Sequence, residues 1–184
     1  GSFEARRFRA VVFDATGQFL IAANQNGQVH FWDISRDLEL QNPQIMYCRD
    51  SLVRTIAIHP DGHLLASGGD DGNVRLWRFP SGEFLGELPG HLSDESDGNW
   101  IRKIIFSRNG SLLAASSEKG KIQVWNIISR KTVNLFNAHD GRVWEIAFCP
   151  EGKAIVSGSD DQQIKLWSLS EDQCLTTLQG YTCK

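Results

Sequence analysis

Few residues of this chain have the types and spacing that support catalysis or metal binding. His139, Ser157 and Asp161 are the three side-chain types of a hydrolytic triad and lie in one short segment. His59 and His63 have H-x-x-x-H spacing, but two further zinc ligands do not lie nearby in the sequence. The sequence contains no G-x-x-x-x-G-K loop, no G-x-S-x-G elbow and no H-E-x-x-H motif. We therefore expect no catalytic residue, no metal and no cofactor, and hydrolysis stays open as the alternative.

The segment LSDESDGNW carries an acidic run formed by Asp94, Glu95 and Asp97. Carboxylates bind divalent cations and attract basic partners, whereas acidic residues on a surface loop are usually only solvated. We expect the solvated state here, with cation or partner binding as the alternative.

Composition describes an ordinary globular protein with nearly balanced charge. Among 184 residues, 41% are hydrophobic, and 19 Lys and Arg oppose 22 Asp and Glu for a net charge of -3. This balance argues against a general attraction to nucleic acid or anionic lipid. No apolar stretch reaches the roughly 18 residues of a membrane span, and the four cysteines form no C-x-x-C pair. We expect reduced cysteines, no membrane or nucleic-acid partner, and a cytoplasmic location.

An internal repeat determines how the chain is organised. The segments GQVHFWDI, GNVRLWRF, GKIQVWNI and QQIKLWSL place Trp32, Trp77, Trp125 and Trp167 at spacings of 45, 48 and 42 residues. These spacings bracket the period of four-stranded propeller blades. Four such units fill the chain.

Each unit divides into short runs in which apolar and polar residues alternate, which is typical of strands. In the last unit we expect strands at 143–148, 154–157, 164–169 and 174–178. The turn after the first strand ends in glycine in every unit, at Gly17, Gly62, Gly110 and Gly152. Glycine supplies the positive φ that such hairpin turns require.

These residues resemble the WD-repeat β-propeller family over positions 3 to 182. The family repeat runs from a Gly-His pair, here Gly90-His91, to a Trp-Asp pair, here Trp32-Asp33. The resemblance implies an all-β fold with four four-stranded antiparallel blades. The expected boundaries are 3–47 for blade 1, 48–90 for blade 2, 91–137 for blade 3 and 138–179 for blade 4, with 180–184 as the start of a next repeat or a tail. Residues 1 and 2 look like the remnant of an expression tag.

The resemblance also implies a structural role for the triad-like residues. In the family a His, a Ser or Thr, an Asp and the Trp of one blade form a hydrogen-bonded tetrad, and blade 4 has His139, Ser157, Asp161 and Trp167 at these positions. Other blades depart from this pattern at Glu4, Ala22 and Asn26 in blade 1, Arg49 in blade 2, and Ala115 and Lys119 in blade 3. We expect those blades to depend more on apolar packing, and local stability to be uneven.

Four blades do not make up the seven or eight that usually close such a ring. An open arc leaves an apolar face on blade 1 and another on blade 4. We expect two chains to join head to tail as an eight-bladed ring, or the chain to be a fragment of a longer propeller. A strained four-bladed ring within one chain is the third alternative.

The family binds partners at the narrow end of the ring, through the start of the first strand of each blade and the turn before the tetrad aspartate. Carried over to this sequence, these positions are Arg9, Leu52, Arg54, Asp70, Trp100, Arg102, Glu118, Arg142, Trp144 and Asp160. Arg and Trp are frequent interface anchors. The alternative is that the arginines and acidic residues only pair with one another as a solvated ring.

The leading hypothesis is a non-enzymatic scaffold that binds a protein or peptide. The alternative is a sensor or regulatory propeller from a larger multidomain signalling ATPase, because the segment CLTTLQGY resembles the repeats of bacterial proteins of that kind. Fold alone does not identify the ligand.

Overall fold

The computed structural model describes residues 7–35, 43–48, 52–90 and 98–180, and these residues form strands and turns without a helix. Four antiparallel sheets of four strands each follow one another along the chain. Their strands are β1 (Phe8–Phe13), β2 (Phe19–Asn24), β3 (Gln28–Asp33) and β4 (Gln44–Tyr47); β5 (Val53–Ile58), β6 (Leu64–Gly69), β7 (Val74–Arg78) and β8 (Glu83–Glu87); β9 (Ile101–Phe106), β10 (Leu112–Ser117), β11 (Lys121–Asn126) and β12 (Lys131–Asn137); and β13 (Val143–Phe148), β14 (Ala154–Ser159), β15 (Gln163–Ser168) and β16 (Gln173–Gln179). The all-β fold of four-stranded blades is thereby confirmed.

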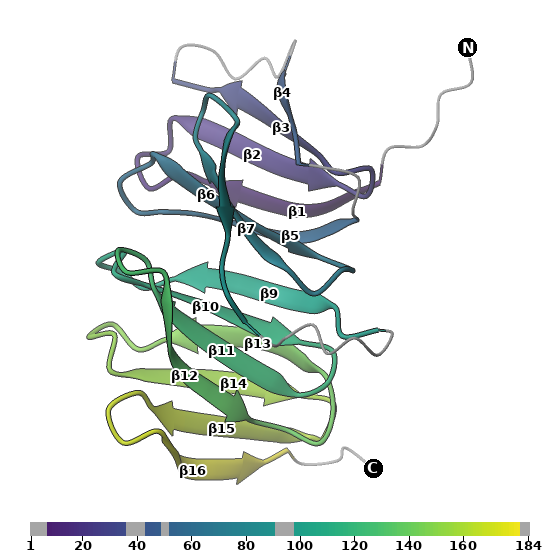
Figure 1. Ribbon diagram of the computed structural model, residues 1–184. Helices are drawn as coiled ribbons and strands as arrows, with labels where there is room; N and C mark the ends of the chain where they lie inside the picture. Colours follow the sequence, from purple (N-terminus) through teal and green to yellow (C-terminus); the bar gives the residue numbers. More distant parts are fainter. Residues whose placement is uncertain (1–6, 36–42, 49–51, 91–97, 181–184) are drawn as a thin grey trace.

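The four sheets stack in chain order, with blade 1 and blade 4 at opposite ends of the stack (Figure 1). The first strands of neighbouring blades are in contact, so that β5 packs on β1, β9 on β5 and β13 on β9. The structure is therefore an open arc, and the four-bladed ring within one chain is not formed.

The hairpin between the first two strands of every blade turns on the glycine that the sequence indicates. Gly17, Gly62, Gly110 and Gly152 have φ angles of 71°, 77°, 74° and 69°. Side chains other than glycine rarely adopt this conformation. The predicted strands of blade 4 also agree with β13 to β16 to within two residues.

Three apolar clusters hold neighbouring blades together, one at each of the three interfaces. Between blades 3 and 4, the side chains of Ile122, Val124 and Phe136 pack on Val143 and Trp167, and all five are buried. The same pattern recurs between the other blades, with Trp77 and Trp125 in the place of Trp167. Burial of about 25 cal/mol per Å² of apolar surface makes these interfaces the main source of stability.

Candidate functional site

Arginine and tryptophan side chains stack alternately along one end of blades 2, 3 and 4. The guanidinium carbon of Arg54 lies 4.3 Å from the ring centre of Trp100, and that of Arg102 lies 5.4 Å from Trp100 and 4.7 Å from Trp144. Arg142 continues the stack at 5.4 Å from Trp144. All four distances are within the range of cation–π attraction. We call these five residues the Arg–Trp ladder.

A β-bulge at the start of the first strand of each blade presents the ladder. Val53 pairs with Gly69 and Thr55 with Gly68, so Arg54 is the extra residue, which has no partner on the neighbouring strand. Arg102 occupies the same place in β9 and Trp144 in β13. A bulge bends the strand and changes the direction of the side chain beside it. The backbone itself therefore positions three of the five ladder residues.

Acidic residues at the ends of the second strands neutralise the ladder arginines. Arg54 pairs with Asp70 and Arg102 with Glu118, each within its own blade. Arg142 crosses between blades, with its Nε 3.1 Å from Glu118 Oε1 and 3.1 Å from Asp160 Oδ2. The indole N–H of Trp144 donates to Asp160. Side chains held from two directions in this way lose little rotational freedom when they bind a partner.

The outer end of the ladder faces solvent. Trp144 is 46% exposed and the Arg142 side chain 44%, whereas Arg54 and Arg102 are half-buried. Leu52, two residues before Arg54, is also 46% exposed. Nine of the ten partner-binding residues that the sequence analysis indicates thus lie on blades 2 to 4, at the end of these blades where the first strands begin. The tenth, Arg9, is exposed on blade 1, where Gln25 takes the acidic position, and no ion pair joins Arg9 to a carboxylate among the described residues.

The triad-like residues of blade 4 form a buried chain of hydrogen bonds. Trp167 Nε1 donates to Ser157 Oγ at 2.9 Å, Ser157 Oγ lies 2.7 Å from His139 Nε2, and His139 Nδ1 lies 2.8 Å from Asp161 Oδ2. The carboxylate only accepts, so Nδ1 carries the proton and, in the neutral ring, Nε2 accepts from the serine hydroxyl. Ser157 is 1% exposed. Its hydroxyl is engaged inside the blade by Trp167 and His139.

Four matches to one family model cover most of the chain. The model for the WD domain, G-beta repeat, matches residues 4–33, 43–78, 82–126 and 130–168. The chain belongs to the WD40-repeat family. It is 26% identical over 182 residues to the nuclear distribution protein nudF of Emericella nidulans, with 88% of this chain and 39% of that protein covered.

Two plant proteins are similar as well. The chain is 31% identical over 149 residues to the guanine nucleotide-binding protein subunit beta of Zea mays, with 77% of this chain and 38% of that protein covered. It is 29% identical over 152 residues to the transcriptional corepressor LEUNIG_HOMOLOG of Arabidopsis thaliana, with 83% and 18% covered. This WD40-repeat chain therefore spans about two fifths of these relatives or less.

Blades 1 and 3 contain buried polar networks that differ from the tetrad. In blade 1, Asn24 Nδ2 donates to Gln28 Oε1 at 2.9 Å and lies 3.4 Å from His30 Nε2. In blade 3, Gln123 Nε2 donates to Thr132 Oγ1 at 2.8 Å, and the Trp125 indole donates to the carbonyl of Pro89. Amide side chains thus form polar networks where tetrad members are missing, and the expectation that these blades depend more on apolar packing stays a prediction.

Blade 2 keeps part of the tetrad. Trp77 Nε1 donates to Ser67 Oγ at 2.8 Å, and Asp71 pairs with Arg75 at 2.5 Å.

Beside Ser67, burial raises the pKa of the Cys48 thiol to about 12, which keeps the thiol protonated and unreactive. Cys48, Cys149 and Cys174 form no disulfide.

Several predicted residues lie outside the described part of the chain. These are Glu4, Arg49, His91, Asp94, Glu95 and Asp97. His59 is described, and its Nε2 donates to the carbonyl of Gly110 at 3.0 Å. Within the described ranges, no group of three or more His, Cys, Asp or Glu residues is arranged to hold a metal ion.

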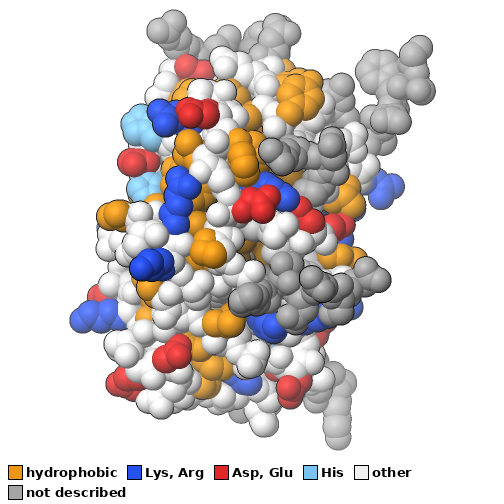
Figure 2. Space-filling model, in the orientation of Figure 1, with side chains coloured by type: hydrophobic (Ala, Val, Ile, Leu, Met, Phe, Trp, Pro, Cys, Tyr) orange, Lys and Arg blue, Asp and Glu red, His pale blue; other side chains and the backbone are white. Residues whose placement is uncertain are grey.

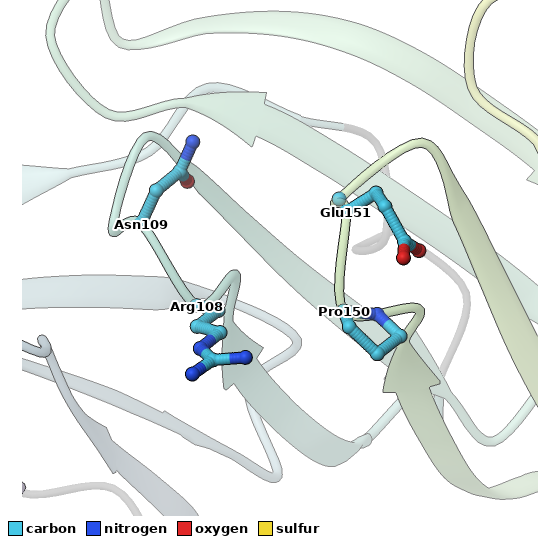
Figure 3. A pocket seen from close by; sticks show the side chains of 5 residues that line it. Arg108, Asn109, Pro150 and Glu151 are labelled. Atoms are coloured by element: carbon cyan, nitrogen blue, oxygen red, sulfur yellow. The ribbon is translucent and has the colours of Figure 1, made fainter.

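A hollow of about 260 Å³ lies between two hairpin turns, at the end of the blades opposite the ladder. Figure 3 shows Arg108 and Asn109 on one turn and Pro150 and Glu151 on the other. All four residues are exposed, so none of them offers a buried charged group to a ligand in the hollow. It offers no site comparable with the ladder.

Replacing Ser157 with alanine should destabilise the protein by about 1 to 3 kcal/mol, because both Trp167 and His139 lose their shared partner in a buried position. Urea unfolding followed by tryptophan fluorescence measures this change. The control is Ser81→Ala at an exposed turn, which should change the free energy of unfolding by less than about 0.5 kcal/mol. Equal effects of the two substitutions would contradict a stabilising tetrad.

The Asp161 carboxylate should make stability depend on acid pH. Burial alone raises its pKa, but hydrogen bonds from the His139 ring and the Gln163 N–H, with the nearby His139 charge, outweigh burial and leave the pKa below its ordinary value. A carboxylate with a depressed folded pKa stabilises the protein above the unfolded pKa of about 3.9, and this contribution disappears as pH falls through the folded pKa.

Urea unfolding between pH 7 and pH 3 tests this dependence. The stability difference between the wild-type protein and Asp161→Asn should shrink as pH falls below about 4. Ser81→Ala, at the exposed turn used above, is the control, and its stability difference from the wild type should not narrow in this way. A difference that stays constant down to pH 3 would refute the assigned role.

Proposed function

We propose that this WD40-repeat chain is a non-enzymatic scaffold that binds a protein or peptide through the Arg–Trp ladder. The observation that carries the proposal is the continuous stack of three arginines and two tryptophans, whose outer end is exposed. Arg and Trp concentrate binding energy in protein interfaces because they combine contact area with directed donors. The flanking carboxylates hold the stack in place before a partner arrives.

The charge distribution favours a protein partner over nucleic acid. Each ladder arginine faces a carboxylate, so the ladder presents no unneutralised row of positive charge. Acidic and basic side chains are interspersed over the face drawn in Figure 2. Binding to phosphate backbones depends on clusters of unpaired Lys and Arg. Among the described residues, no helix has the length and apolar character of a membrane span. We also propose a cytoplasmic location.

The relatives support a role in assemblies. One relative carries the name of a G-protein subunit and another that of a corepressor, and neither name denotes catalysis. The buried Ser157 supports the absence of hydrolysis, because its hydroxyl is engaged by Trp167 and His139. The second candidate is a regulatory propeller of a larger signalling ATPase, favoured by the segment CLTTLQGY. The reading frame of the parent gene distinguishes the two candidates.

Replacing Trp100, Arg102 and Trp144 together with alanine should remove partner binding. Loss of this stack should weaken the affinity for an isolated partner by about 30-fold or more, the range of interface hot spots. Affinity capture with quantitative mass spectrometry identifies proteins bound by the wild type, and calorimetry with the purified partner measures the affinity.

The matched control is Ile128→Ala, at a side chain that is 90% exposed in the turn between β11 and β12. This variant should retain every partner of the wild type. Circular dichroism establishes that the triple variant is folded. Undiminished partner binding by a folded triple variant would contradict the proposed function.

A further inference from the structure

The outer face of blade 4 is apolar and uncovered. On it, Val156, Ile164 and Leu178 are 37%, 47% and 58% exposed. Their counterparts on blade 3 are Ala114, Ile122 and Phe136, as the pairing of Ile122 with Phe136 and of Ile164 with Leu178 shows. Those counterparts are at most 4% exposed, because blade 4 covers them. The uncovered face thus repeats a face that elsewhere binds a blade.

Blade 1 carries the complementary face, which is also uncovered. Phe8 and Val11 are 45% and 60% exposed. Val143 and Ile146 occupy the same positions of the first strand in blade 4, where they pack on blade 3 and are at most 2% exposed. Leu20 and Trp32 follow in blade 1 at the positions that Ile155 and Trp167 fill in blade 4. All four apolar positions of the contact are therefore present on blade 1.

We propose that a second copy of this chain seats its blade 1 on blade 4 of the first, in the register of the three interfaces inside the chain. The same contact formed twice, about a twofold axis, closes an eight-bladed ring and leaves no blade face exposed. Apolar faces of this extent rarely stay in water. One chain carries the residues needed on both sides of the contact.

A shallow hollow on blade 4 has the position and chemistry to receive Phe8 of the second copy. Its volume is about 140 Å³, and it is lined by Ile146, Val156, Gly158 and Ile164, among others. Gly158 has the strand position that Gly68 has in blade 2. A Cβ placed on Gly68 would come within 2.7 Å of Ile101 and Ile104 of blade 3, which shows how closely the next blade packs on this glycine.

The corresponding space at Gly158 is empty, since a Cβ there meets no atom within 4 Å. Phe8 and Val11 occupy in blade 1 the positions that Ile101 and Ile104 occupy in blade 3. In the proposed register these two side chains of the second copy lie over Gly158. The missing side chain at Gly158 accommodates the larger phenylalanine ring.

Charge is complementary at the same contact. Inside the chain, Arg142 of blade 4 reaches back to Glu118 of blade 3 at 3.1 Å. At the contact between copies, Asp160 takes the position of Glu118, and Arg7 of the second copy takes that of Arg142. Arg7 is exposed, and the Asp160 side chain is 44% exposed. The pair would extend the row of ion pairs from one copy to the next.

Light scattering coupled to size-exclusion chromatography tests the proposal with the chain as it stands. The wild type should elute at twice the 20.6 kDa chain mass, about 41 kDa. Gly158→Arg should elute at the mass of one chain, because the new side chain fills the space proposed for Phe8, while its Cβ meets no atom of its own chain within 4 Å. Leu178→Asp, on a different strand of the same face, should do the same. Ile128→Arg, on an exposed turn, is the control and should stay dimeric.

Arg7→Glu tests the register, and should raise the dissociation constant of the dimer about tenfold in sedimentation at low salt. Thermal unfolding of each variant at a concentration where it is monomeric establishes that the fold is intact. A wild-type mass of one chain at every concentration would overturn the proposal. So would a series of masses above that of two chains, which indicates an open polymer, or a dimer that survives both Gly158→Arg and Leu178→Asp.

Discussion

Contact between neighbouring sheets is the interaction on which the rest of this structure depends. Each blade is a four-stranded sheet with apolar side chains on both faces, so each face is stabilised when another sheet packs on it. Within the chain this happens at three interfaces, where residues such as Phe136 and Trp167 meet. Apolar side chains on a sheet face stabilise the protein only when a neighbour removes them from water. The fold, the binding face and the proposed assembly all follow from the way in which these contacts are repeated.

The repeated contact also explains how the ladder arises. Neighbouring first strands lie side by side, and each carries its bulge at the same position. The bulged residues of adjacent blades are therefore brought close enough for Arg102 to stack on both Trp100 and Trp144. A substitution on one blade would affect the neighbouring blade through this stack. The candidate site is a property of several blades together and does not exist on any one of them.

Much of this organisation could be predicted from the sequence because it is periodic. The recurring tryptophans and turn glycines predict the blades, and the resemblance to the WD-repeat family implies that Ser157 and His139 meet in blade 4. The bulges could not be predicted in the same way, since the residue types around Arg54 are those of a regular strand. The acceptor of the Trp125 indole was also hidden, because the Pro89 carbonyl lies far away in the sequence and belongs to the backbone. Side-chain patterns carry no information about backbone acceptors brought close by folding.

Buried polar networks occur both in the terminal blades and in an inner blade. Blades 1 and 4 are each covered by a neighbour on one face only, and these two blades hold the networks built around Asn24 and His139. Blade 3, covered on both faces, has its own network around Gln123, and blade 2 has the indole to hydroxyl bond between Trp77 and Ser67. Hydrogen bonds inside a sheet do not depend on a neighbour, whereas apolar burial does. The terminal blades can therefore keep their shape while one face is open, which is the condition under which a second copy would have to recognise them.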